Sequence, residues 1–226
     1  MIGMQVYRLA FQLCKSYDLP MTQAAVLTGD LIGSTEAGPE AVDRAMRVLS
    51  KAAMHSALQE SHRFTRSRGD GWQAIVIPAN RYLRISAYFL AKLRQADLKL
   101  QTRIGIGVGS VTSLPARNLS NAAGTAFLYA GYALDEISGS DRLEIQWPDN
   151  SNLAWHQASM ETLTYFSGRW SVEQAEAIAA RLLMQLAPLN TIAEHLNITR
   201  QALSSRLAVA GEKPIMAAIR ATEATL

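Results

Sequence analysis

Residues 62–77 read HRFTRSRGDGWQAIVI, and the interpretation of the whole chain starts from this stretch. Two segments with strand composition, His62–Arg68 and Trp72–Ile77, flank the turn sequence Gly69-Asp70-Gly71. Glycines on both sides of an aspartate favour a tight reversal of the chain between paired strands. The stretch therefore predicts a β-hairpin that carries the carboxylate of Asp70 at its turn.

The segments around this hairpin alternate between strand and helix patterns. Upstream, the apolar run Ala24–Thr28 ends at Gly29-Asp30 and predicts a buried strand, and residues 39–61 have helical spacing with Pro39 in the first turn. The downstream segments with helix or strand patterns are residues 80–96, 102–112, 123–138 and 142–147. This order is typical of an α+β ferredoxin-like palm with additions, and we expect its helices on one side of the sheet.

The chain divides into three parts. Residues 1–20 have an amphipathic pattern that ends at Pro20, and they predict an N-terminal helical extension. Residues 21–149 form the expected palm. Residues 150–226 carry no strand signal and predict an all-α domain with a helix-turn-helix over residues 191–209.

The composition excludes several classes of protein. The 226 residues are 49% hydrophobic and 18% charged, which excludes a disordered or low-complexity chain. The single cysteine, Cys14, cannot form an internal disulfide, and no stretch approaches the roughly 18 apolar residues of a membrane span. We therefore expect a cytoplasmic protein with no signal peptide, anchor or membrane contact. Residues 171–226 hold five basic and five acidic residues, so they form no polybasic tail.

Two aspartates next to glycines form a candidate site. In a palm, the end of the first strand lies beside the hairpin turn, so Asp30 and Asp70 are expected to meet. Two close carboxylates repel each other unless a cation such as Mg²⁺ or Mn²⁺ neutralises them, and substrate phosphates usually complete the coordination of Mg²⁺. Gly33, Ser34 and Thr35 would offer backbone N–H groups and hydroxyls to these phosphates. In the alternative interpretation, both aspartates only make turns.

Several segments resemble, in order and separation, the class III nucleotide cyclase homology domain. The chain is still more similar to the SatD family, small bacterial proteins that combine such a palm with a helix-turn-helix. The resemblance implies that Asp30 and Asp70 bind two metal ions on a nucleoside triphosphate, and we include Leu31 among the candidate metal ligands. The segments that carry the resemblance are TGDLIGST (28–35), RGDGWQAIV (68–76), TRIGIGVGSV (102–111), GTAFLYAGYALDEI (124–137) and RWSVEQAEAI (169–178).

The sequence departs from the cyclases on the helix after the fourth strand. Cyclases carry there an asparagine and, four residues later, an arginine, where this chain has Leu128 and Tyr132. Losing donors aimed at transition-state charge costs about 2.7–4 kcal/mol each, so we do not expect ordinary cyclase turnover. Arg66 and Arg68 would substitute as triphosphate ligands, or they would simply face water on an edge strand.

Two other patterns have simpler interpretations. Gly105, Gly107 and Gly109 alternate within a strand, which indicates close packing of a helix rather than a phosphate loop. The four histidines show no pairing at metal-ligand spacing, so zinc is not expected.

Residues 191–207 read TIAEHLNITRQALSSRL and have the pattern of a helix-turn-helix. Asn197 breaks a first helix and Thr199 caps a second one, whose inward residues are Ala202, Leu203 and Leu207. The candidate DNA-binding residues, all expected on the outward face or at the cap, are Thr199, Arg200, Gln201, Ser204, Ser205 and Arg206. The alternative is a helical hairpin used only for packing or dimerisation.

The flanking aromatic residues are expected in the core, and they are Trp155, Tyr165, Phe166 and Trp170. The sequence favours a DNA-binding transcription regulator, paired as a homodimer, whose palm binds a divalent metal and a nucleotide. The alternative is an active enzyme on nucleoside triphosphates, a cyclase or a phosphohydrolase, with the helical part as a targeting device. A third reading is a palm that serves only as a dimerisation scaffold.

Overall fold

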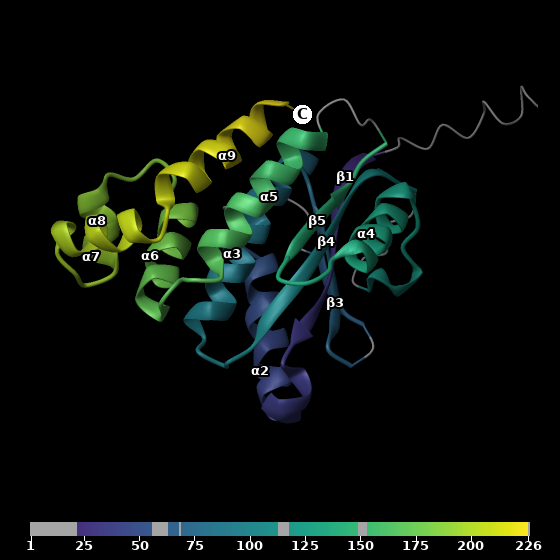
Figure 1. Cartoon of the computed structure of the whole chain (residues 1–226), viewed down its shortest axis with the longest axis horizontal. Coiled ribbons are helices and arrows are strands. Elements are labelled where there is room, and N and C mark those ends of the chain that lie inside the picture. Colours follow the sequence, from purple (N-terminus) through teal and green to yellow (C-terminus); the bar gives the residue numbers. More distant parts are fainter. Residues whose placement is uncertain (1–21, 56–62, 68, 113–117, 149–152, 226) are drawn as a thin grey trace, which may run out of the picture.

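The computed structural model describes residues 22–55, 63–67, 69–112, 118–148 and 153–225. Within these ranges the chain is an α+β protein with a five-stranded mixed sheet and eight α-helices (Figure 1). The predicted extension over residues 1–20 lies outside them, as do His62 and Arg68. None of the described helices is long and apolar enough to cross a membrane.

The strands are β1 (Thr22–Ile32), β2 (Arg63–Arg66), β3 (Gly71–Val76), β4 (Gln101–Val111) and β5 (Leu143–Gln146). The helices are α2 (Ser34–Ala53), α3 (Tyr82–Gln95), α4 (Thr125–Glu136), α5 (Leu153–Ser167), α6 (Val172–Leu183), α7 (Leu189–His195), α8 (Arg200–Val209) and α9 (Glu212–Thr225). Two short 3₁₀ turns, Ala79–Arg81 before α3 and Leu119–Asn121 before α4, complete the described elements.

The strand order in the sheet is β2-β3-β1-β4-β5. The central strand β1 is antiparallel to both neighbours, β2 and β3 form a hairpin, and β5 is parallel to β4. In this register Asp30 lies opposite Gly71 on β3 and Arg103 on β4. Asp30 therefore lies beside the hairpin turn, as predicted, although β1 continues through Gly29-Asp30 to Ile32 and does not turn there.

The two faces of the sheet are covered by different helices. On β1, Ala25 and Leu27 belong to a large core with α2 and α3, whereas Ala24 and Val26 belong to a smaller core with α4. Figure 1 shows α4 on one side of the sheet and α3 with α5–α9 on the other. The expectation that all helices lie on one side is wrong, because the glycines of β4 let α4 lie directly on the sheet.

The glycines of β4 form the contact surface for α4, as their alternation indicated. A Cβ atom at Gly107 would lie 2.1 Å from the carbonyl oxygen of Ala126 and 2.2 Å from the nitrogen of Ala130. A Cβ atom at Gly105 would lie 2.3 Å from the nitrogen of Leu134. Real Cβ atoms do not approach backbone so closely, so only glycine allows this distance between helix and strand.

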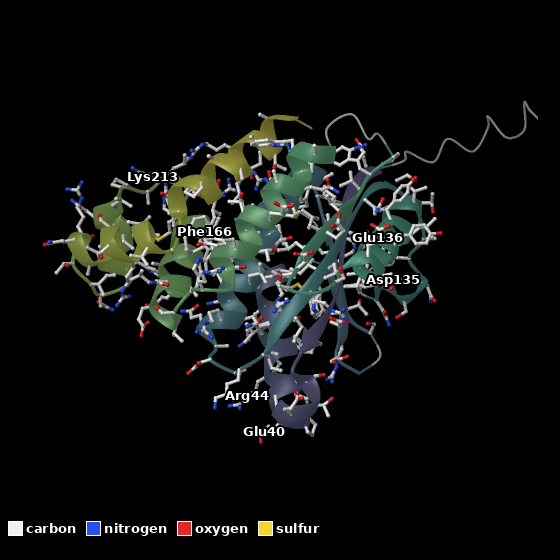
Figure 2. The ribbon with its side chains drawn as sticks, viewed as in Figure 1. Glu40, Arg44, Asp135, Glu136, Phe166 and Lys213 are labelled. Atoms are coloured by element: carbon white, nitrogen blue, oxygen red, sulfur yellow. The ribbon has the colours of Figure 1, made fainter. Side chains whose placement is uncertain are left out.

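Helix α2 starts with one separate turn. Gly38 has φ 81° and ψ 168°, which interrupts the helix between Ser34–Ala37 and the segment that begins at Pro39. The predicted start at Pro39 thus corresponds to the second part of α2, because proline suits the first turn of a helix. Glu40 and Arg44 are exposed on the side of this helix away from the sheet (Figure 2).

The helices after β5 pack against α3. The side chain of Trp170 is fully buried and its Nε1 donates a hydrogen bond to the carbonyl oxygen of Ala210 at 2.8 Å. Arg94 of α3 donates to the carbonyl oxygen of Trp170 at 2.6 Å. The buried side chains of α6–α9 join the core of α2 and α3, and the predicted domain boundary near residue 150 falls outside the described residues.

Two of the four aromatic residues expected in the core are exposed. The side chains of Trp155 and Tyr165 are 44% and 55% exposed, whereas Trp170 is buried and Phe166 is half-buried. The guanidinium of Arg169 lies 3.8 Å from the centre of the Tyr165 ring and covers it from outside. The expectation that all four lie in the core is therefore wrong for Trp155 and Tyr165, because the face of α5 that carries them is covered by no described element.

A polar cluster joins α9 to the start of α3. The buried Arg84 forms two hydrogen bonds with the carboxylate of Glu223, at 2.5 and 2.8 Å, and Asn80 donates to the carbonyl oxygen of Glu223 at 2.8 Å. A hydrogen bond joins Tyr82 Oη to His156 Nδ1. Burial raises the pKa of Tyr82 and lowers the pKa of His156, so both side chains are neutral near pH 7.

Candidate functional site

The carboxylate of Asp30 forms an ion pair with Arg103 on the neighbouring strand. Arg103 Nε donates to Asp30 Oδ1 at 2.9 Å, and Arg103 Nη2 donates to Asp30 Oδ2. The two residues are direct neighbours in the register of β1 and β4, so both side chains project from the same face of the sheet. By alternation along β4, this face is the one that α4 covers at Gly105.

Asp70 occupies the hairpin turn and contacts the start of α2. Its carboxylate accepts a hydrogen bond from the hydroxyl of Ser34. Gly33, with φ 81°, provides the left-handed turn that connects β1 to Ser34. Three segments therefore meet at this end of the sheet: the end of β1, the turn between β2 and β3, and the first turn of α2.

The charges at this sheet end interact. The hydrogen bonds to Asp30 raise the pKa of Arg103 and are the largest effect. Burial opposes them, and the negative charges of Asp30 and Asp70 each add a smaller upward effect. Arg103 thus lies in the field of both carboxylates. The sequence interpretation missed this residue, although its position two residues before Gly105 placed it on the glycine face of β4.

Gly33, Ser34 and Thr35, the predicted phosphate-binding residues, do not lie at the N-terminus of a long helix. Only a single turn follows, because Gly38 interrupts α2, so the dipole of the longer segment does not point at these residues. Ser34 is engaged with Asp70, and Thr35 is exposed. These three residues can therefore offer a phosphate only the two hydroxyl groups and the backbone N–H groups of one helical turn.

The remaining candidates of this site have distinct placements. Leu31 has its side chain in the core, so only its main chain can ligate a metal. Arg66 donates to Asp43 at 2.6 Å and to the carbonyl oxygen of Gly69 at 2.9 Å, so it braces the hairpin against α2 instead of facing water alone. Arg68 lies outside the described residues.

Polar side chains continue along the same sheet face. Gln73 on β3 lies opposite Thr28 on β1, and its amide donates to the Thr28 hydroxyl at 3.4 Å. On α4, Leu128 and Tyr132 are 51% and 53% exposed. Within the described residues, no group of three or more His, Cys, Asp or Glu side chains could hold a metal ion, and the carboxylates of Asp30 and Asp70 bond different partners, Arg103 and Ser34.

The second candidate region consists of α7, a tight turn and α8. Asn197 adopts φ 53°, and the amide of Ile198 donates to the carbonyl oxygen of Ala193 at 3.0 Å. The hydroxyl of Thr199 accepts from the amide of Ala202 at 3.1 Å, so the predicted cap is confirmed. The side chains buried in this unit are Ile192, Ala193, Leu203 and Leu207.

The residues of α8 predicted to face outward are exposed, with one exception. Arg200, Gln201, Ser204 and Ser205 are exposed, as is the cap residue Thr199. Arg206 is half-buried, and its Nη1 lies 3.3 Å from Glu176 Oε2 on α6. The expectation that Arg206 faces outward is wrong, because it lies three residues after the buried Leu203, on the same side of α8, and α6 offers it a carboxylate.

Glu176 also connects this unit to helix α3. Its second oxygen accepts from the amide of Gln95 at 3.5 Å, and Gln95 in turn accepts from Lys92 at 2.5 Å. Burial lowers the pKa of Lys92, and the charge of Glu176 partly offsets this effect. Through these contacts α8 is held in a defined orientation against α6 and α3.

Comparison with protein-family models found no family that matches this chain, and comparison with curated proteins found no relative.

Proposed function

We propose that the protein is a cytoplasmic DNA-binding transcription regulator in which α7 and α8 form a helix-turn-helix and α8 enters the major groove. The observation that carries this proposal is the exposed polar row at the start of α8, formed by Arg200, Gln201, Ser204 and Ser205. Short polar and planar groups in the first turns of such a helix reach base edges. Because the unit has little net charge, we propose a homodimer that binds two half-sites.

We further propose that the sheet belongs to a ferredoxin-like palm of the class III nucleotide cyclase type, as in the SatD family. The order β2-β3-β1-β4 with an antiparallel centre supports this assignment, and β5 is then an additional strand. In such a palm, the site at Asp30 and Asp70 takes a nucleoside triphosphate with a divalent cation.

The residues present fit Mg²⁺ or Mn²⁺. Both ions prefer oxygen ligands, and Mg²⁺ uses one or two carboxylates together with waters and substrate phosphates. Asp30 and Asp70 supply two carboxylates, and the hydroxyl of Ser34 lies next to Asp70. The ion would neutralise charge on the bound phosphates, while Asp30 and Asp70 would hold it.

A regulatory role is favoured over catalysis by the exposed residues of α4. Leu128 carries no hydrogen-bond donor and Tyr132 carries one hydroxyl, where cyclases align two donors on the developing charge. The second candidate function is an enzyme that acts on nucleoside triphosphates, and the adjacency of Asp30 to the hairpin turn favours it. Chromatography after incubation with each triphosphate and Mg²⁺ or Mn²⁺ separates the two, because a 3′,5′-cyclic or hydrolysed product that Asp30→Ala abolishes would establish the enzyme.

The DNA proposal predicts that two arginines of α8 behave differently. Arg200→Ala should weaken binding to the preferred duplex by about 1–3 kcal/mol and relax the choice of bases, because Arg200 lies in the first turn. Arg206→Ala should leave the base preference unchanged. It should reduce the slope of log binding constant against log salt concentration by less than about one, because Glu176 already neutralises Arg206. Binding isotherms at several salt concentrations on selected and scrambled duplexes measure both effects.

Wild-type protein that binds neither duplex at low salt, with or without nucleotide, would exclude the regulator. The unit of α7 and α8 would then be a module for packing or for a protein partner.

The nucleotide proposal predicts that Asp70→Asn weakens binding of Mg²⁺-nucleoside triphosphate by about tenfold or more, because one of two carboxylate charges is lost. Asparagine still accepts the hydrogen bond from Ser34, so the turn is expected to keep its structure. Glu40→Gln is the matched control, since Glu40 is an exposed carboxylate on the side of α2 away from the sheet. Calorimetry that shows equal affinities for wild type and Asp70→Asn would reject the site.

A further inference from the structure

Arg103 occupies both oxygens of the carboxylate that the proposed metal requires. The guanidinium Nε of Arg103 donates a hydrogen bond to Oδ1 of Asp30 at 2.9 Å, and Nη2 donates one to Oδ2. A carboxylate that accepts hydrogen bonds from a guanidinium on both oxygens binds a divalent cation poorly, because one lone pair on each oxygen is engaged and the two cations repel each other. Arg103 and a metal ion therefore compete for Asp30.

Arg103 cannot release Asp30 by losing its proton, because arginine stays charged in proteins. It can release Asp30 only by moving to another anion. The side chains of Arg103 and Asp30 are 39% and 28% exposed, so the pair lies at the surface where the guanidinium has room to swing. Arg66, at the end of the hairpin strand β2, is held by Asp43 and by the carbonyl oxygen of Gly69.

A triphosphate supplies the anion that Arg103 needs, since the guanidinium fork matches phosphate oxygens as well as carboxylates. We propose that Arg103 exchanges partners when ligand binds: it neutralises Asp30 in the free protein and passes to the triphosphate when the divalent cation takes Asp30. This inference rests on the proposed nucleotide site and adds a residue to it. The cation alone and the triphosphate alone then bind weakly, and the two bind together strongly.

The exchange predicts opposite effects of one substitution. Arg103→Gln frees Asp30, so the variant should bind Mn²⁺ alone about tenfold more tightly than wild type, the effect of one neighbouring charge on a carboxylate. The same variant should bind the Mn²⁺ complex of inorganic triphosphate more weakly than wild type, because the phosphates lose an arginine. Arg103→Lys keeps the charge without the fork and should lie between the two.

The experiment measures Mn²⁺ by electron paramagnetic resonance and the Mn²⁺-triphosphate complex by calorimetry, on the full chain. Arg142→Gln is the matched control, because Arg142 is a nearby cation that bonds Gln101 and main-chain oxygens instead of Asp30. It removes the same charge and should change both affinities little. Thermal unfolding of each variant verifies that the chain is folded.

The outcomes separate the exchange from the site. If wild type binds the Mn²⁺-triphosphate complex and Arg103→Gln leaves Mn²⁺ affinity equal or weaker, the exchange is overturned and the nucleotide site stands. Equal changes in Arg103→Gln and Arg142→Gln also overturn it, because they show a general effect of charge. If wild type binds neither probe, the nucleotide site and the exchange fail together.

Discussion

Replacing Glu223 by glutamine is expected to lower the free energy of unfolding by about 3–5 kcal/mol, the usual cost of removing one partner of a buried ion pair. The side chain of Arg84 is only 3% exposed, and that of Glu223 is 25% exposed. Arg84 Nη1 is already buried without a hydrogen-bond partner, so Glu223 carries the only described carboxylate that compensates this guanidinium. Urea unfolding followed by circular dichroism measures the loss.

Two further variants identify the cause of this loss. The double variant Arg84→Met with Glu223→Leu should recover most of the stability, because no charge is then left buried. Asp43→Asn removes a carboxylate from an exposed pair with Arg66 and should cost less than about 1 kcal/mol. If Glu223→Gln costs no more than Asp43→Asn, the pair between α9 and α3 contributes nothing specific.

The second large effect is expected at Gly107. Gly107→Ala should destabilise the protein by about 3 kcal/mol, at the upper end of the cost of overpacking a core. The added Cβ would lie 2.1 Å from the carbonyl oxygen of Ala126 and 2.2 Å from the nitrogen of Ala130. These are backbone atoms, which cannot rotate out of the way as a flexible side chain can. Helix α4 would have to move off the sheet, and the exposed Leu128 and Tyr132 would move with it.

Gly131→Ala on the same helix is the control. Nothing lies within 4 Å of a Cβ at Gly131, so alanine should stabilise α4 by about 0.5–1 kcal/mol. Thermal or urea unfolding of the two variants gives changes of opposite sign if α4 lies on the glycines of β4. Equal stability of Gly107→Ala and wild type would contradict this packing.

The sequence by itself determined the local parts of the structure. The turn at Asp70, the glycine stripe of β4, the break at Asn197 and the cap at Thr199 were all predicted and are all present. Each depends on residues within a few positions of one another, because turns, caps and the periods of strand and helix arise from neighbouring backbone groups. Such patterns are legible without knowing where the segments lie.

The tertiary structure decided which side chains meet across the chain. Arg103 with Asp30 and Arg84 with Glu223 are separated by 73 and 139 positions. Arg206 turns to Glu176 rather than outward, and α4 covers the face of the sheet opposite to α3. No local period encodes these pairings, because they follow from strand register and from the choice of sheet face, which are set only when the whole core is packed.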